Sequence, residues 1–273
     1  MGLKAVPFGA TQREVERLGA LSLSSEAEPS PPSPAVNPPG PGTLQRTLFG
    51  GDEDVMMQGQ RRTPIPAATA FTTPVLPTEE KRRQLKEMDG NEVSRCTKCR
   101  LCEHRTHTVF GEGDVDAKVF FIGEGPGETE DQTGRPFVGR AGELLNKMIG
   151  AMGLKREQVY IANIVKCRPP GNRVPAPDEV ATCTPYLQRQ LEIVRPQAIV
   201  TLGLPATQYM LETKLSMGRL RGQWHAWRGI KLMPTYHPAY VLRNPSYETR
   251  AAVWSDLKKV LTELGMPVPK KNL

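Results

Sequence analysis

Five cysteines have the most specific spacing in this chain. They are Cys96, Cys99, Cys102, Cys167 and Cys183. The first three form two overlapping C-x2-C pairs, and such a pair with two later cysteines can supply four thiolates to a tetrahedral zinc ion or to a [4Fe–4S] cluster. The spacing leaves open which cysteines of the first group bind metal, and the alternative is five free thiols. We expect a metal site because C-x2-C pairs commonly mark metal or redox sites.

Three polar segments, each rich in Gly or Pro, follow expected strands. They are residues 123–131 (GEGPGETED), 166–173 (KCRPPGNR) and 236–243 (YHPAYVLR). In a parallel sheet the carboxyl ends of the strands meet at one edge, where such folds bind their ligands. The first segment lacks the full G-x-G-x-x-G spacing of a dinucleotide loop, and alone it also fits an ordinary strand–helix turn. Together the three segments predict one site at one edge of the sheet.

The elements that would position these segments alternate between strands and helices. Strands are expected at residues 118–124, 158–166, 198–203 and 231–235, and helices at 11–23, 78–88, 141–152, 177–194, 205–211 and 247–264. The helix at 177 begins with Pro, which suits the first helical position. This alternation predicts an α/β fold with a parallel sheet covered by helices on both faces.

Composition divides the chain near residue 90. Residues 1–90 hold 12 of the 26 prolines and no Cys, Trp or Tyr. This predicts a disordered Pro/Ser-rich extension over residues 1–77, a folded domain over 78–265 and a tail over 266–273. Residues 1–90 contain 10 Lys and Arg and 11 Asp and Glu, so they are nearly neutral. The remaining residues contain 26 Lys and Arg and 18 Asp and Glu, so they are basic. A basic domain suits a polyanionic partner, although the same charge also fits a merely soluble basic protein.

The sequence carries no recognisable signal for export or membrane insertion. Its first residues lack the apolar stretch of a signal peptide, and Val6 stands where a myristoylation signal needs Ser or Thr. No apolar run approaches the ~20 residues of a membrane helix. We therefore expect a cytoplasmic, nucleoid-associated monomer that does not bind a membrane. In that compartment cysteines serve as metal ligands or catalytic groups more often than as disulfides.

Six motifs occur in unbroken order within residues 80–265. They are the C-x2-C pair, VFGEG at 109–113, GEGPGETED at 123–131, GRPFVGRAGELL at 134–145, NIVKCRPPGNR at 163–173 and HPAYVLR at 237–243. In these motifs the chain resembles the family 4 uracil-DNA glycosylases, the iron–sulfur branch of their superfamily in bacteria and archaea. The resemblance implies a three-layer sandwich with a central four-stranded parallel sheet. It also implies a repair enzyme that flips uracil out of DNA and hydrolyses its N-glycosidic bond, which leaves an abasic site for base excision repair.

The resemblance also implies a [4Fe–4S] cluster with a structural role. Its ligands would be Cys96, Cys99, Cys167 and Cys183, which leaves Cys102 spare. A four-cysteine zinc site in a non-catalytic DNA-binding module is the alternative that the spacing leaves open. Another alternative is a superfamily relative that becomes covalently trapped on uracil-DNA through a basic loop containing a His. Residues 139–143 read GRAGE here, which favours turnover.

Three residues match the family's base-binding and catalytic positions. Asn163 matches the residue that reads uracil, because an amide offers a donor to O4 and an acceptor to N3–H, and cytosine reverses both. Phe137 matches the aromatic residue that stacks on the flipped base. His237 matches the catalytic His, which donates to uracil O2 as negative charge develops there. Without the resemblance, these residues would be interpreted as a turn-capping Asn, a core Phe and a structural His.

The first and last motifs supply the remaining candidates. Gly125 stands where other branches hold a water-positioning Asp, so Glu124 is the leading candidate for stabilising the water or the developing cation. Glu130 would crowd uracil C5 and exclude the methyl group of thymine. Backbone N–H groups of the loop 123–127, which includes Gly125, would contact uracil or a DNA phosphate. Leu242 or Arg243 would fill the gap in the DNA left by the flipped base. For both glutamates, the alternative is an acid at a helix N-terminus.

Basic residues near these loops are candidate contacts to DNA phosphates, and individually each also fits a solvated surface charge. They are Lys166, Arg168, Arg173, Arg219 and Arg221. A separate docking motif lies in the N-terminal extension. Gln45, Leu48 and Phe49 fit the Q-x-x-L-F pattern by which bacterial proteins bind the replication sliding clamp. Short patterns of this kind also recur by chance, and a plain flexible tether is the alternative.

Overall fold

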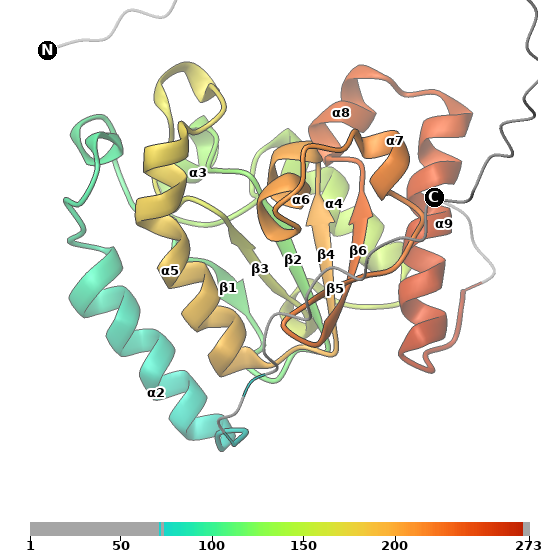
Figure 1. Cartoon of the computed structure of the whole chain (residues 1–273), viewed down its shortest axis with the longest axis horizontal. Coiled ribbons are helices and arrows are strands. Elements are labelled where there is room, and N and C mark those ends of the chain that lie inside the picture. The colour runs from blue at the N-terminus through green and yellow to red at the C-terminus, as the bar shows by residue number, and fades with distance from the viewer. Residues whose placement is uncertain (1–70, 72–73, 270–273) are drawn as a thin grey trace, which may run out of the picture. The chain divides into compact units, whose positions relative to one another are not determined.

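The computed structural model describes residues 71 and 74–269 of the protein (Figure 1). The expected helix at 11–23 and the docking motif with Gln45, Leu48 and Phe49 lie outside the described residues, as does the end of the predicted tail. Within the described part, no helix is long and apolar enough to cross a membrane.

Four parallel strands form the centre of the sheet, which confirms the predicted fold class. They are β2 (Val119–Gly123), β3 (Tyr160–Asn163), β4 (Ala198–Leu202) and β6 (Ile230–Thr235), in the order β3-β2-β4-β6. Two short antiparallel strands, β1 (Glu112–Gly113) and β5 (His225–Trp227), complete a six-stranded sheet at its edges. The sequence prediction omitted these edge strands because two or three residues are too few to show an alternating pattern.

Helices cover both faces of the sheet (Figure 1). They are α2 (Thr78–Met88), α3 (Glu128–Thr133), α4 (Arg140–Ala151), α5 (Pro177–Val194), α6 (Leu204–Met210), α7 (Met217–Leu220), α8 (Pro238–Arg243) and α9 (Tyr247–Glu263). Those at 128–133, 217–220 and 238–243 were not expected from the sequence, because segments of four to six residues are too short to show helical periodicity. The strand predicted over 158–166 ends earlier, at Asn163, because its partner β2 ends at Gly123. Beyond that point only single bonds continue, such as the one from the Ile164 N–H to the Gly123 carbonyl at 3.0 Å.

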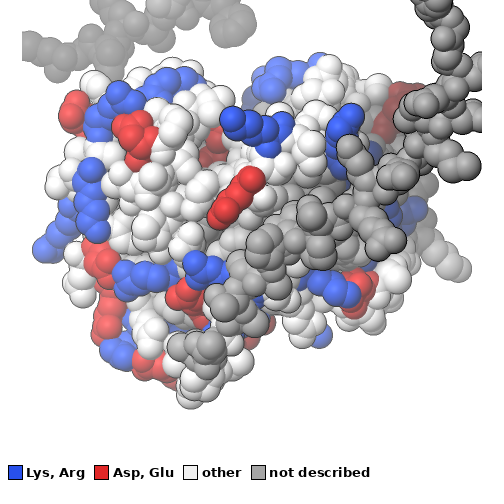
Figure 2. Space-filling model, in the orientation of Figure 1, with Lys and Arg blue, Asp and Glu red and all other residues white. Residues whose placement is uncertain are grey.

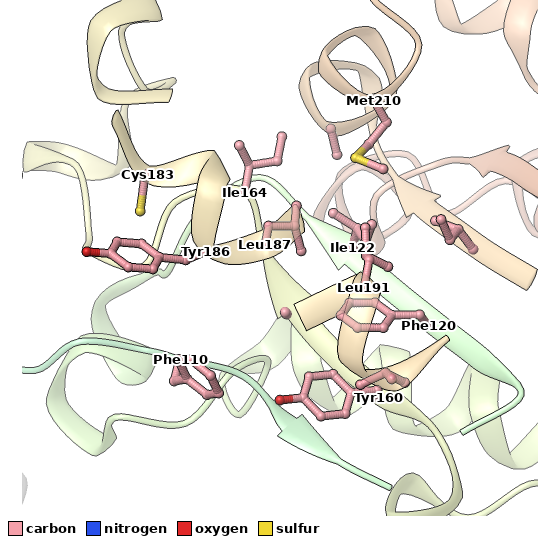
Figure 3. Close-up of a cluster of buried hydrophobic side chains, with 14 of the residues drawn as sticks. Phe110, Phe120, Ile122, Tyr160, Ile164, Cys183, Tyr186, Leu187, Leu191 and Met210 are labelled. Carbon is pink, nitrogen blue, oxygen red and sulfur yellow. The ribbon is translucent and has the colours of Figure 1, made fainter. Parts of the chain in front are cut away.

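The hydrophobic core forms one cluster on each face of the sheet. Alternate residues of β2 divide between them: Phe120 and Ile122 belong to the first cluster, and Val119 and Phe121 to the second. Figure 3 shows the first cluster, where Leu187 of α5 lies over the sheet near Ile122. Every residue of β2, β3 and β4 is buried. The strands therefore hold the groups at their carboxyl ends on a rigid base.

Candidate active site

A cleft of about 1050 Å³ opens at the carboxyl ends of the parallel strands. Figure 1 shows α3, α6, α7 and α8 gathered at this end of the sheet. All the residues predicted to act in catalysis, base binding or DNA insertion line the cleft: Glu124, Gly125, Glu130, Phe137, Asn163, His237, Leu242 and Arg243. The structure therefore brings together side chains that lie more than 100 positions apart in the sequence, at the edge predicted from the strand order.

Asn163 forms part of the cleft wall, at the end of β3. Its side chain is 1% exposed, and its Oδ1 is the one buried side-chain N or O atom without a hydrogen-bond partner among the described residues. Gly123 lies beside it in the sheet, and a Cβ atom at Gly123 would stand only 2.3 Å from that oxygen. A buried acceptor without a partner costs about 1–3 kcal/mol. Asn163 is therefore prepared to accept a hydrogen bond from a ligand in the cleft.

Phe137 presents a flat ring in the same cleft. Its ring centroid lies 5.7 Å from that of His237, and the residue is 5% exposed. Its φ angle of 50° is unusual for a bulky residue and marks a strained backbone. The Arg156 guanidinium donates to the Phe137 carbonyl at 3.2 Å, and α4 passes so close that a Cβ on Gly142 would overlap this carbonyl. These contacts hold the Phe137 backbone in a conformation that the isolated segment would avoid, and so help to position the ring.

His237 precedes α8 and caps it. Its Nδ1 accepts a hydrogen bond from the Ala239 N–H at 3.0 Å, which leaves the proton of the neutral ring on Nε2. Burial, assisted by the nearby charge of Arg243, lowers the pKa of His237 to about 4. The ring is therefore neutral at physiological pH, and its Nε2–H is available as a hydrogen-bond donor.

Two glutamates differ sharply in their surroundings. Burial raises the pKa of the Glu124 carboxyl, which lines the cleft. Glu130 instead accepts three backbone N–H bonds: Oε1 from Val138 at 2.9 Å and Gly139 at 2.8 Å, and Oε2 from Gly127 at 3.1 Å. The Glu130 carboxylate therefore connects the start of α3 to the loop before α4 through hydrogen bonds. This is the alternative that the sequence analysis gave for Glu130, an acid that binds backbone N–H groups at a helix N-terminus.

Leu242 and Arg243 end α8 at the rim of the cleft. Leu242 is 40% exposed, which fits the predicted insertion into DNA. Figure 2 shows Lys and Arg side chains along the upper edge of the molecule, the edge at which α7 and α8 lie in Figure 1. Such a charge distribution favours binding of a phosphate backbone.

The candidate phosphate contacts divide into exposed and buried residues. Arg219 is exposed and Arg168 is partly exposed, so these two are accessible to a phosphate. Arg173 is exposed too, but its guanidinium donates to both carboxylate oxygens of the buried Glu179, at 2.8 and 2.6 Å. The prediction for Lys166 was wrong, because this side chain is 1% exposed and its Nζ donates to the carbonyl of Asn163 at 2.9 Å. Arg221 is also occupied, because it donates to both carboxylate oxygens of the buried Asp256. A local sequence pattern does not reveal such burial.

The five cysteines line a second, smaller cavity. None forms a disulfide, and Cys96, Cys99, Cys102, Cys167 and Cys183 all face this cavity together with Tyr186. Figure 3 shows Cys183 and Tyr186, both on α5, at one end of the first core cluster. In the described residues, no three His, Cys, Asp or Glu side chains are arranged to hold a single metal ion. The fold thus gathers the predicted ligands around one space.

Hydrogen-bond donors surround these sulfurs. The Arg105 guanidinium donates to Cys167 Sγ at 3.2 Å, the backbone N–H of Lys166 to Cys183 Sγ at 3.2 Å, and the Tyr186 hydroxyl to Cys96 Sγ at 3.7 Å. Burial raises the pKa of Cys183 to about 11 and also raises those of Cys99 and Cys167. A bound cation would stabilise the thiolates, which the donors around them also favour.

Comparison with known proteins finds a matching family model and several relatives. Residues 110–258 match the model of the uracil DNA glycosylase superfamily. The chain is 48% identical over 180 residues to a type-4 uracil-DNA glycosylase of Thermotoga maritima, covering 65% of this chain and 94% of that protein. It is 46% identical over 188 residues to one of Saccharolobus solfataricus, covering 66% and 86%. A type-5 uracil-DNA glycosylase of Pyrobaculum aerophilum is 30% identical over 170 residues, covering 56% and 75%.

Proposed function

Because the chain belongs to the type-4 uracil-DNA glycosylases of the uracil DNA glycosylase superfamily, we propose that its cleft binds a uracil flipped out of DNA and that residues of the cleft hydrolyse the bond to deoxyribose. The protein is a DNA repair hydrolase that acts on N-glycosyl bonds and takes uracil-containing DNA as substrate.

The base pocket is assigned from Asn163, because its buried Oδ1 has no hydrogen-bond partner in the part of the chain that the structure describes. In uracil, N3–H would donate to Oδ1, and O4 would accept from the Asn163 amide. Cytosine presents an acceptor at N3 and a donor at C4, so it would leave buried polar groups unpaired. The Phe137 ring would stack on the base, a contact worth ~1–3 kcal/mol. The Glu130 side chain lines the cleft and would keep the methyl group of thymine out.

Bond cleavage would rely on His237 and Glu124. As the bond from C1′ to N1 breaks, its electron pair moves into the uracil ring and negative charge develops on O2. The Nε2–H of neutral His237 would donate to this oxygen. The Glu124 carboxylate would stabilise the positive sugar and accept the proton of the water that attacks C1′. The uracil anion takes up one proton as Glu124 releases one, so the products are uracil and an abasic site.

We also propose that Cys96, Cys99, Cys167 and Cys183 hold a [4Fe–4S] cluster, with Cys102 beside it. The fit rests on the shared cavity and on the donors aimed at three of the four sulfurs. When bound, the cluster would supply structural cross-links rather than reaction chemistry.

Metal analysis of the purified protein tests the cluster. Iron with absorbance near ~400 nm is expected, and a colourless protein containing zinc would contradict the cluster. Cys99→Ala should lower the iron content. Cys102→Ala is the matched control and should retain it.

Two finer proposals concern the setting of the enzyme. We place it in the cytoplasm at the nucleoid, where its DNA substrate lies. We also propose that the replication sliding clamp binds the protein through Gln45, Leu48 and Phe49, which fit its docking pattern. The double variant Leu48→Ala/Phe49→Ala should abolish pull-down of the clamp while uracil excision from a short oligonucleotide is unchanged. Unchanged pull-down would refute the clamp proposal.

Incubation with a uracil-containing oligonucleotide, followed by alkali, tests the main proposal. The wild-type protein should yield strand breaks at uracil. Asn163→Ala and His237→Ala should each lower the single-turnover rate by about 10²–10³-fold, as removal of a transition-state donor does. Asn91→Ala alters an exposed Asn far from the cleft lining and should leave the rate unchanged. A wild-type protein that leaves uracil in place would refute the proposed function.

A further inference from the structure

An aromatic ring lies at the rim of the cleft without a role in the mechanism above. Tyr240 belongs to α8, three residues after His237, and is 39% exposed. It lines the cleft beside Leu242 and Arg243.

The Tyr240 ring is held in place from below. It stacks on the ring of Tyr236, with centroids 4.8 Å apart and planes inclined by 26°. The Arg221 guanidinium carbon lies 5.2 Å from the centroid of the Tyr236 ring. This places a cation and a second ring under Tyr240, so the exposed ring is supported before any ligand binds.

A buried carboxylate fixes this stack to the body of the protein. Asp256 of α9 is 0% exposed and receives two bonds of 3.0 Å from one nitrogen of Arg221. The hydroxyl of Thr235, the last residue of β6, donates to Asp256 at 2.8 Å. The stack therefore rests on the sheet and on α9, and little conformational entropy remains to be lost when a flat ligand contacts Tyr240.

We propose that Tyr240 is a stacking platform for the nucleobase next to the flipped uracil on the same DNA strand. The inference rests on the proposed function and adds a second nucleobase site to it. Flipping one base removes a stacking partner from its neighbour, which then exposes a flat face. Tyr240 lies on the short helix α8 with Leu242 and Arg243, the residues predicted to insert into DNA, and it lines the same cleft. It therefore lies where the neighbouring base would pass. Aromatic platforms accept every base, because each base has a π-face.

Fluorescence of 2-aminopurine tests the platform directly. The probe is an oligonucleotide with 2-aminopurine placed immediately 5′ or immediately 3′ to a 2′-fluorinated deoxyuridine, a nucleotide whose glycosidic bond resists hydrolysis. Wild-type protein and Tyr240→Phe should quench one of the two probes on binding, because both keep the ring. Tyr240→Ala should lose this quenching and bind about 5- to 150-fold more weakly, the equivalent of one lost base–aromatic stack.

The control is Tyr247→Ala, which removes a ring that is 75% exposed on α9 and does not line the cleft. This variant should quench and bind as the wild type does. Equal quenching by the wild type and Tyr240→Ala at both probe positions would overturn the platform. Failure of the proposed function is distinguishable, because the wild type would then leave uracil in an unmodified oligonucleotide. A thermal melt of each variant establishes that it is folded.

Discussion

Gly123→Ala is the substitution that most directly tests the geometry of the base pocket. Gly123 ends β2, and its backbone lies outside the left-handed region, so alanine causes no backbone strain there. The added Cβ would stand 2.3 Å from Asn163 Oδ1 and 2.5 Å from Phe137 Cζ. Carbon and oxygen normally approach to ~3.3 Å, and two carbons to ~3.5 Å. The amide that reads the base and the ring that stacks on it must therefore each move by about 1 Å.

A displacement of about 1 Å at a substrate-positioning group can cost roughly 10²-fold in rate. We therefore expect Gly123→Ala to lower the single-turnover rate of uracil excision about 100-fold, with a loss of about 1–3 kcal/mol in the free energy of unfolding from overpacking. The assay is quenched-flow or manual mixing of excess enzyme with a uracil oligonucleotide, with chemical denaturation to measure stability.

Gly150→Ala is the matched control for this substitution. Gly150 is an exposed residue of α4, and no atom lies within 4 Å of a Cβ placed there. Alanine at this position should keep full activity and stabilise the helix by up to about 1 kcal/mol. If folded Gly123→Ala excised uracil within about threefold of the wild-type rate, Asn163 and Phe137 would not form the base pocket as described.

Three further predictions concern titration and buried charge. Burial raises the pKa of Glu124, so the rate of excision should fall in acid as this carboxylate is protonated, and Glu124→Gln should abolish that dependence along with most of the activity in a pH–rate profile. Folding lowers the pKa of His237 from 6.5 to about 4. The contribution of its neutral form to the free energy of unfolding is therefore complete above pH 6.5 and is lost as the pH falls to about 4. His237→Asn should flatten this part of a plot of unfolding free energy against pH. Lys166→Met removes the ammonium that binds the Asn163 carbonyl, so it should lower both the free energy of unfolding and the excision rate per folded molecule. Lys81→Met is the control. It removes a similarly buried ammonium remote from the cleft and should lower the free energy of unfolding alone. Equal excision rates in these two lysine variants would refute a positioning role for Lys166.

Much of the fold follows from local sequence patterns. The helix predicted at 177–194 matches α5, because Pro177 starts it and apolar residues recur at helical spacing until Val194. The strand predicted at 118–124 matches β2 within one residue at each end, because its short apolar run is bounded by polar residues. The site follows as well, since parallel strands bring their carboxyl ends to one edge.

Side-chain partners that arrive from distant segments could not be predicted in this way. Lys166 lies in a polar, Pro-rich segment that resembles a surface loop, yet Gln190 of α5 accepts a bond of 2.6 Å from its ammonium group. Arg221 is held by Asp256, which lies 35 positions later in the chain. Tyr236 and Tyr240 have helical spacing, but their stacking appears only when the end of β6 meets α8. In each case packing between distant segments determines the role of the residue, and the local sequence pattern does not indicate which segments will meet.

The segment from Asn163 to Cys167 connects the two sites of this protein. Asn163 faces the base cleft, and Cys167 faces the cysteine cavity four residues later. Lys166 joins the two, because its ammonium binds the Asn163 carbonyl and its backbone N–H binds Cys183 Sγ. A cluster bound to Cys167 and Cys183 would fix this segment to α5. The proposed cluster would therefore act on uracil recognition by limiting the movement of Asn163, without taking part in the reaction.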